Sequence, residues 1–280
     1  MEKGSTEKKL VGIFDSGVGG LSVLREIQAL LPTQPLYYIG DQAHVPYGKR
    51  QPAEIRRFSF AMTRYLLDAG AGLIVVACNT ASAVALKDLR QEFPDVPFVG
   101  MEPALKPATQ QTHNKVVGVL ATPATFQGEL YNTLVEKFAQ DVKILTSTLP
   151  GMVEAIEAGR LDTPQTRAIL EEAIMPMLAQ GADTLVLGCT HFPFALPLIR
   201  QITGPDVNVI DPAPAIARRT HALLQEHHLL NPDGNSVSLQ FATSGDLNVF
   251  NASIVNLLHL QAQPMQLVWD ASGNKIQREG

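Results

Sequence analysis

Short runs of apolar residues alternate along the chain with longer segments in which apolar positions recur at helical spacing. The apolar runs predict eight strands, at Leu10–Phe14, Leu36–Ile39, Leu73–Ala77, Phe98–Val99, Val116–Leu120, Val142–Leu145, Thr184–Leu187 and Val207–Ile210. The clearest helical segments between or after them are Leu21–Leu31, Glu54–Asp68, Thr166–Leu178 and Ala213–Glu226. Strands separated by helix-length segments indicate parallel βαβ units. Ligands of such sheets bind beyond the carboxyl ends of the strands.

The second half of this pattern repeats the first. Shifting the sequence by 111 residues places Cys78 on Cys189, with matching apolar residues before each cysteine. The matching segments are 66–80 with 177–191, 94–104 with 205–215 and, at a slightly different shift, 9–16 with 115–122. Three matches in the same order predict two related α/β halves.

This repeat predicts an α/β fold of two similar parallel-sheet domains, related by pseudo-twofold symmetry, with the active site in the cleft between them. We expect residues 1–101 and 212–280 to form the first domain and residues 102–211 the second. Each domain carries one cysteine, directly after an equivalent strand and ahead of an equivalent helix. If the domains pack face to face, the two thiols confront each other across the cleft. Residues beyond about 215 have no counterpart and are expected to pack back on the first half.

Composition narrows the class of protein. Hydrophobic residues make up 45% and charged residues 18% of the 280 residues, which is typical of a filled globular core. The net charge of −5 and the lack of a basic run argue against a nucleic-acid partner. The uncharged stretch from Ala69 to Leu86 contains glycines, Asn79 and Thr80, so it predicts a strand, a loop and a helix rather than a membrane span.

Cysteine usage and the start of the chain predict the compartment. Two cysteines cannot form a disulfide framework, and cytosolic thiols usually stay reduced. Residues 1–9 are polar and lack the apolar segment of a signal peptide. We therefore expect a cytoplasmic protein without a membrane partner.

The duplicated cysteines carry the candidate chemistry. A cysteine at a strand end is usually a small hydrophobe, but here both are followed by polar pairs, Asn79-Thr80 and Thr190-His191. A helix N-terminus beyond each cysteine would stabilise a thiolate and offer backbone N–H groups to an anion. A redox dithiol usually has its cysteines close in sequence, and a metal site needs more soft ligands than two cysteines and one histidine. Proton transfer fits better, because two thiols on opposite faces of one carbon can invert its configuration.

The segment FDSGVGGLSVL runs from a strand through a glycine-rich turn into a helix. It lacks the last glycine of G-x-G-x-x-G and the lysine of a Walker motif, so tight backbone packing explains its glycines better than nucleotide binding. Asp15 and Ser16 end the strand and are placed to reach a ligand ammonium or carboxylate. Asp15 is also placed to orient or activate Cys78.

Three further segments supply polar residues at predicted loops and helices. In GDQAHVPYG, the segment Pro46-Tyr47-Gly48 either forms a plain turn or presents backbone N–H groups to a carboxylate. Asp41 adds a buried charge that we count as a catalytic candidate. ATPAT supplies two threonines after a strand. GMVEAIEAG carries Glu154 and Glu157 at helical spacing, and solvated helix charges are the default interpretation for both.

Five motifs, in order and spacing, resemble those of the cofactor-independent glutamate racemases of bacteria over nearly the whole chain. They are GIFDSGVGGLSV, GDQAHVPYG, VVACNTASA, GVLATPAT and GCTHFPF. The resemblance implies interconversion of L- and D-glutamate, which supplies D-glutamate for peptidoglycan. It implies no cofactor, pyridoxal phosphate included, no metal, and a homodimer whose geometry cannot be carried over.

The resemblance also implies roles for particular residues. Cys189 would remove the α-proton of L-glutamate and Cys78 that of D-glutamate, each thiol reprotonating what the other deprotonates. Asp15 would assist Cys78, His191 would assist Cys189, and Glu157 would support His191. The residues implied to hold the substrate are Asp15, Ser16, Tyr47, Gly48, Asn79, Thr80, Thr122, Thr125, Thr190 and His191. Many relatives have a proline where this chain has Glu154, so Glu157 is assigned by its spacing to Cys189.

Two alternatives stay open at this point. A sister racemase acting on aspartate or another acidic amino acid tends to carry histidine soon after Asn-Thr and glutamate after the second Cys-Thr. This chain has Ala81-Ser82 and His191 there, which favours glutamate. A non-catalytic, two-lobed protein that binds an acidic ligand is the other alternative, although binding alone does not need two thiols.

Overall fold

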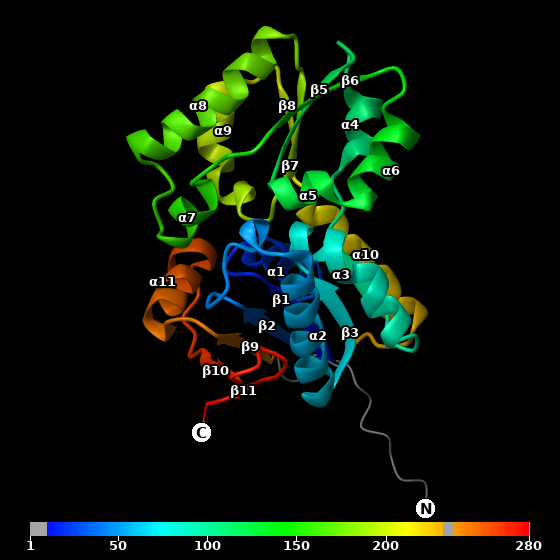
Figure 1. The fold of residues 1–280 in the computed structure, drawn as a ribbon, viewed down its shortest axis with the longest axis vertical. Helices are drawn as coiled ribbons and strands as arrows, with labels where there is room; N and C mark the ends of the chain where they lie inside the picture. Colours follow the sequence, from blue (N-terminus) through cyan, green and yellow to red (C-terminus); the bar gives the residue numbers. More distant parts are fainter. Residues whose placement is uncertain (1–9, 232–237, 280) are drawn as a thin grey trace, which may run out of the picture.

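The computed structural model describes residues 10–231 and 238–279, which form two α/β lobes stacked along the long axis of the molecule (Figure 1). The expectation for residues 1–9 lies outside the described residues. The first sheet contains β1 (Leu10–Asp15), β2 (Leu36–Gly40), β3 (Ala71–Val76), β4 (Phe98–Gly100), β9 (Leu239–Thr243), β10 (Met265–Trp269) and β11 (Ile276–Arg278). The second sheet contains β5 (Val116–Ala121), β6 (Lys143–Ser147), β7 (Thr184–Gly188) and β8 (Asn208–Ile210).

Helices cover both sheets, and α8 and α9 lie on the opposite side of the second sheet from α4 and α6 (Figure 1). The α-helices are α1 (Leu21–Leu30), α2 (Pro52–Asp68), α3 (Asn79–Glu92), α4 (Leu105–Gln111), α5 (Pro123–Gln127), α6 (Glu129–Phe138), α7 (Met152–Glu157), α8 (Pro164–Ala179), α9 (Leu196–Thr203), α10 (Ala213–Glu226) and α11 (Leu247–Leu258). Two 3₁₀ helices are η1 (Tyr47–Lys49) and η2 (Phe192–Ala195). Within the described ranges, no helix has the length and apolar character needed to cross a membrane.

The predicted repeat is visible in the order of the strands. Part of the first sheet runs β2-β1-β3-β4, and the second sheet runs β6-β5-β7-β8, so each strand has an equivalent. All pairs within these two sets are parallel. β1 and β7 are almost fully buried, which explains why they read as unbroken apolar runs rather than as alternating patterns. The predicted α/β class with two parallel-stranded sheets is confirmed.

Residues 239–278 extend the first sheet by three strands that the apolar pattern did not predict. β9 pairs in parallel with β2, β10 pairs with β9, and β11 runs antiparallel to β10. These strands lie toward the edge of the sheet and are only partly buried, so they carry no continuous apolar run. The first sheet is therefore mixed at its edge, and the domain boundaries at 101/102 and 211/212 stay a prediction.

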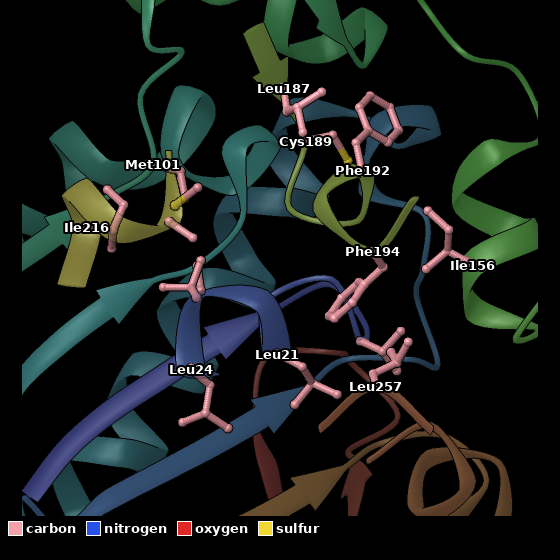
Figure 2. Packing of buried hydrophobic residues seen from close by; sticks show 14 of the residues in the cluster. Leu21, Leu24, Met101, Ile156, Leu187, Cys189, Phe192, Phe194, Ile216 and Leu257 are labelled. Atoms are coloured by element: carbon pink, nitrogen blue, oxygen red, sulfur yellow. The ribbon is translucent and has the colours of Figure 1, made fainter. Parts of the chain in front are cut away.

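One hydrophobic cluster runs from the first lobe into the second. It joins Leu21 and Leu257 of the first lobe to Leu187, Cys189 and Phe194 of the second. Figure 2 shows the ring of Phe194, a residue of η2, directed toward Leu257 of α11. Burying a side chain of this size contributes roughly 1.5–3 kcal/mol, so the cluster favours contact between the lobes.

Candidate active site

The loops at the carboxyl ends of both sheets meet around a small cavity of about 20 Å³. Its wall is formed by Ser16, Pro46, Tyr47, Gly48, Cys78, Asn79, Thr80, Thr122, Val153, Cys189, Thr190 and His191. A larger hollow of about 950 Å³ lies between α2 and α3 on one side and α5 and α6 on the other, but neither cysteine lines it. The small cavity is the candidate active site because both thiols reach it.

Cys78 stands at the junction of β3 and α3. It is the N-cap residue of α3, and its sulfur accepts a hydrogen bond from the backbone N–H of Ala81 at 3.4 Å. The thiol lies 3.8 Å from the Ser16 hydroxyl. Burial and the neighbouring charge of Asp15 raise the pKa of Cys78 well above its ordinary value. The resting form of this residue is therefore the neutral thiol.

Asp15 lies behind Cys78 at the end of β1 and is fully buried. One carboxylate oxygen accepts the backbone N–H of Gly20 at 2.6 Å, and the other accepts the Ser16 hydroxyl at 3.4 Å. Burial raises the pKa of Asp15, and the positive charge of His191 and the Gly20 N–H oppose this only in part. Asp15 is outside the cavity wall but close enough to act on Cys78.

Cys189 lies directly after β7 and is the first member of a row of three interacting side chains, Cys189, His191 and Glu157. Its sulfur lies 3.8 Å from His191 Nδ1, and His191 Nε2 lies 2.6 Å from Glu157 Oε1. Burial lowers the pKa of His191, but the bonds to Cys189 and Glu157 outweigh it and hold this pKa well above the ordinary value. Burial raises the pKa of Glu157, yet bonds from His191, Gln42 and Val18 bring it below its usual range. His191 and Glu157 therefore form a pair of an imidazolium and a carboxylate.

The structure therefore brings Glu157 to His191, as the resemblance implied. Glu154, one turn earlier in α7, forms an exposed salt bridge with Lys49 instead. The glycine-rich turn of the first lobe closes over the pair. A Cβ on Gly17 would lie 2.0 Å from Glu157 Oε1, and one on Gly19 would lie 2.3 Å from His191 Nδ1. Close backbone approach, rather than nucleotide binding, explains these two glycines.

The two cysteine loops lead into different helical elements. α3 begins directly after Cys78, whereas η2 lies between Cys189 and α9. The expectation of a helix N-terminus directly beyond each cysteine is therefore wrong for Cys189. Pro193 and Pro197 lie in the first turns of η2 and α9, because proline is accommodated at helix starts but not inside helices. His191 supplies the positive charge that the helix end supplies at Cys78.

The threonines expected to bind substrate form a link between the lobes. Thr80 and Thr122 share a hydrogen bond of 2.9 Å, and Thr122 shares one of 3.0 Å with Thr125, which lies outside the cavity wall. The Asn79 amide is buried in that wall, and neither its oxygen nor its nitrogen has a partner among the residues with described structure. A buried amide without partners indicates a polar ligand.

Asp41 lies behind the cavity rather than in it. Its buried carboxylate accepts the Tyr47 hydroxyl at 2.7 Å, the Ser244 hydroxyl at 2.6 Å and the Trp269 indole N–H at 2.8 Å, with His44 Nδ1 at 3.0 Å. Tyr47 does line the cavity. Asp41 therefore holds a cavity residue in place and ties it to the C-terminal strands.

Sequence reasoning missed two neighbours of the site. Val153 lines the cavity, and Gln42 donates a hydrogen bond to Glu157. Gln42 belongs to a motif already singled out, but Val153 gave no signal beyond its place in an amphipathic segment. Pro46, singled out with Tyr47 and Gly48, lines the cavity beside them. In the two described stretches, no group of three or more His, Cys, Asp or Glu side chains is arranged to hold a metal ion.

A two-lobed α/β fold with one thiol from each lobe at a shared cavity defines a class of enzyme that moves protons at a bound carbon. The chain belongs to the Asp/Glu/Hydantoin racemase family, whose sequence profile matches residues 19–220. It is 47% identical over 262 residues to the glutamate racemase of Roseiflexus sp. (strain RS-1), an alignment that covers 93% of this chain and 95% of the relative.

Solved structures agree with this family assignment. The Escherichia coli glutamate racemase in complex with L-glutamate is 34% identical, with a TM-score of 0.81 and coverage of 97% of this chain and 99% of that chain. The Francisella tularensis glutamate racemase in complex with D-glutamate is 28% identical, with a TM-score of 0.80 and coverage of 92% and 96%. Both likenesses cover the two lobes.

Proposed function

We propose that this protein is a glutamate racemase that interconverts L- and D-glutamate with two thiols and no cofactor, supplying D-glutamate for peptidoglycan. The observation that carries the proposal is the single cavity lined by Cys78 and Cys189, each with its own acid–base partner. Family membership supports the reaction class. The relatives solved with L- and with D-glutamate support the substrate.

In the proposed mechanism, Cys189 as a thiolate takes the α-proton of L-glutamate while the Cys78 thiol donates its proton to the opposite face. The imidazolium of His191 stabilises the Cys189 thiolate before the transfer. Afterwards Cys189 is a thiol and Cys78 a thiolate, and Asp15 is placed to take part in returning the proton to Cys78. D-glutamate reacts by the reverse sequence.

Substrate recognition depends on the polar wall of the cavity. Asn79, Thr80, Thr122 and Thr190, together with Ser16, Tyr47, Gly48 and backbone N–H groups, would hold the carboxylate and ammonium groups of glutamate. Asp15 and His191 border this set, and Thr125 supports Thr122 from behind. The Asn79 amide, which has no partner among the described residues, is the strongest of these supports, because a ligand would supply the missing hydrogen bonds.

The cavity is too small for the substrate in the conformation described. A volume of about 20 Å³ accommodates about one water, and an amino acid with about ten non-hydrogen atoms needs several times more. The lobes must therefore separate to admit glutamate and close again around it. The Thr80–Thr122 hydrogen bond and the shared hydrophobic cluster would be strained or broken during this opening.

The central experiment measures both optical activity and exchange at the α-carbon. With L- or D-glutamate in deuterium oxide, we expect loss of optical rotation and incorporation of one deuterium at the α-carbon. A chain that exchanges neither enantiomer would be a binding protein, and the enzyme proposal would fail. Faster turnover of aspartate than of glutamate would instead make this chain an aspartate racemase.

The remaining expectations concern assembly and location. We propose a homodimer on the family resemblance, and expect sedimentation of the purified protein to give twice the chain mass of 30.3 kDa. Sedimentation as a monomer at the working enzyme concentration would contradict it. We propose a cytoplasmic location because the reaction needs two reduced thiols, and both cysteines are free. Fractionation that recovers the protein outside the cytoplasm would contradict this.

A further inference from the structure

Two adjacent residues of the loop after β2 bond to two adjacent residues at the end of β9. Asp41 bonds to Ser244, and Gln42 bonds to Thr243. The pairing of β2 with β9 places these residues together, because Gly40 and Thr243 are partners in the register of the sheet. The Asp41 contact leads to Tyr47. The Gln42 contact leads elsewhere, to Glu157 in the second lobe.

The Glu157 carboxylate receives its hydrogen bonds unevenly. Oε1 accepts the Val18 backbone N–H at 2.7 Å and faces His191 Nε2 at 2.6 Å. Oε2 accepts the side-chain N–H of Gln42 at 2.9 Å. No other donor to Oε2 is present among the described residues. Gln42 is therefore the group that stops the carboxylate rotating about its bond to His191.

The orientation of the Gln42 amide is set by its two partners. An ionised carboxylate can only accept hydrogen bonds, so the nitrogen of the amide must face Glu157. The amide oxygen then faces the Thr243 hydroxyl at 3.0 Å, which must donate. Thr243 is fully buried, and its oxygen also accepts the Gly245 N–H at 3.0 Å. Backbone and side-chain contacts thus hold the amide from behind.

We propose that Gln42, oriented by Thr243, is a positioning residue for proton transfer at Cys189. It holds Glu157, which holds the imidazole of His191, which faces the Cys189 sulfur at 3.8 Å. The inference rests on the proposed racemase function. It gives Thr243, from the C-terminal segment, a part in the proton transfer at Cys189. A loosened Glu157 would let the imidazole turn away, and a displacement of about 1 Å can lower a rate about 100-fold.

This chain of contacts reaches one thiol and not the other. The Cys78 sulfur contacts the Ser16 hydroxyl and the Ala81 N–H, both from the first lobe. β9 has no equivalent in the second sheet, so no symmetric counterpart of Thr243 arises from the duplicated strands within the described ranges. Loss of Gln42 should therefore impair proton removal by Cys189 more than proton removal by Cys78.

Racemisation alone cannot reveal this asymmetry, since the equilibrium constant between enantiomers ties the two directions together. Elimination from a glutamate analogue with a leaving group on the β-carbon can reveal it. One thiolate removes the α-proton, a double bond forms between the α- and β-carbons, and the leaving group departs with its electron pair. Each enantiomer thus needs only one thiol, and the Cys189→Ser variant identifies the enantiomer that depends on Cys189.

The test compares both enantiomers of the analogue in four variants. For Gln42→Leu we expect elimination from the Cys189-dependent enantiomer to fall about ten-fold, with the other enantiomer within about two-fold of the parent. Thr243→Val should show the same selectivity with a smaller loss of elimination. Thr243→Ser keeps the hydroxyl, so its elimination from both enantiomers should match that of the parent. Ser244→Ala is the matched neighbour, and we expect it to affect both enantiomers alike through Asp41 and Tyr47.

Equal losses on both enantiomers in Gln42→Leu, or no loss, would overturn the inference, as would an enantiomer-selective loss in Ser244→Ala. Thermal unfolding of each variant separates misfolding from a local effect, because a misfolded variant loses both activities together. The proposed function is tested separately by the parent protein. If the parent protein racemises glutamate but Gln42→Leu shows no selectivity between enantiomers, the role of Gln42 is refuted and the racemase function stands.

Discussion

The two thiols sit at equivalent places in a duplicated fold, yet their surroundings are opposite in charge. Cys78 caps a helix and lies beside a buried carboxyl group, Asp15, and its own pKa is raised. Cys189 lies beside His191, whose pKa is also raised, with Glu157 beyond it. One site therefore favours a neutral thiol and the other offers a cation to a thiolate.

This difference shows how a duplicated fold can give its two thiols different roles, one as proton donor and the other as proton acceptor. A racemase needs one base and one acid at the same moment, and identical surroundings would give both thiols the same protonation state. Duplication supplied the two strand ends, and the loops then diverged. In the proposed mechanism, the neutral Cys78 would be the proton donor and Cys189 the proton acceptor when L-glutamate is the substrate.

Replacing either thiol should have the largest effect. Cys78→Ser and Cys189→Ser should each lower racemisation by about 1,000-fold or more, because a hydroxyl is a far weaker acid than a thiol. With the β-substituted analogue, each variant should keep elimination from one enantiomer, and the two variants should keep opposite ones. Polarimetry and product absorbance measure the two reactions. Full racemase activity in either variant would refute a two-thiol scheme.

Replacing Asp15 or His191, the residues beside the two sulfurs, should lower activity less than replacing a thiol. Asp15→Asn should lower Cys78-dependent elimination about 100-fold, and His191→Gln should do the same for Cys189-dependent elimination. Each variant removes the charge beside one sulfur and leaves the other sulfur's partner in place. Stopped assays with both enantiomers measure this selectivity. If either variant slowed both enantiomers equally, the two environments would not act independently.

The opposite charges should also appear in the pH dependence of stability. The pKa of His191 lies above its unfolded value, so its stabilising effect is complete below about pH 6.5 and is lost as the pH rises through the folded value. The pKa of Glu157 lies below its unfolded value, so its effect is present above about pH 4.3 and is lost as the pH falls through the folded value. Breaking this buried pair should cost about 3 kcal/mol near neutral pH.

Urea unfolding of Glu157→Gln, His191→Gln and the double variant across the pH range measures this coupling. Asp15 provides the contrast, because its raised pKa means that ionisation destabilises the fold as the pH rises. Asp15→Asn should therefore be at least as stable as the parent at neutral pH, whereas Glu157→Gln should be less stable. The same sign for both carboxyl groups would contradict the assigned environments.

The smallest effect concerns the support of Tyr47. Trp269→Phe removes one hydrogen bond donor from the buried Asp41 carboxylate while keeping an aromatic ring against Phe58. We expect a loss of about 1–2 kcal/mol in the free energy of unfolding, since a hydrogen bond to a charged group is lost. A rise in KM for both enantiomers should accompany it. An unchanged KM would mean that Tyr47 does not depend on this contact.

Much of this architecture is dictated by local patterns. The eight predicted strands appear with ends shifted by at most two residues. β1, β2, β3, β5 and β7 are buried along nearly their whole length, and a parallel strand buried on both faces must be a continuous apolar run. β6 and β8 are only partly buried at the edges of the second sheet, but short apolar runs still marked them. The three strands on one side of the first sheet, β9, β10 and β11, were not predicted, because polar residues interrupt them. The helix expected directly after Cys189 begins only at Leu196, because the 3₁₀ helix η2 precedes it. η2 and α9 each have a proline in their first turn.

The duplicated strands and the cysteines at their ends can be inferred from the sequence alone, because an apolar run and a repeat are visible along the chain. Which side chains meet across the lobes depends on the tertiary structure. Gln42 and Glu157 are 115 residues apart, and Asp41 and Trp269 are 228 apart. Such pairs depend on how loops from different strands pack together, and a hydrogen bond needs its two atoms within about 3 Å. No periodic pattern along a chain specifies a distance of that kind.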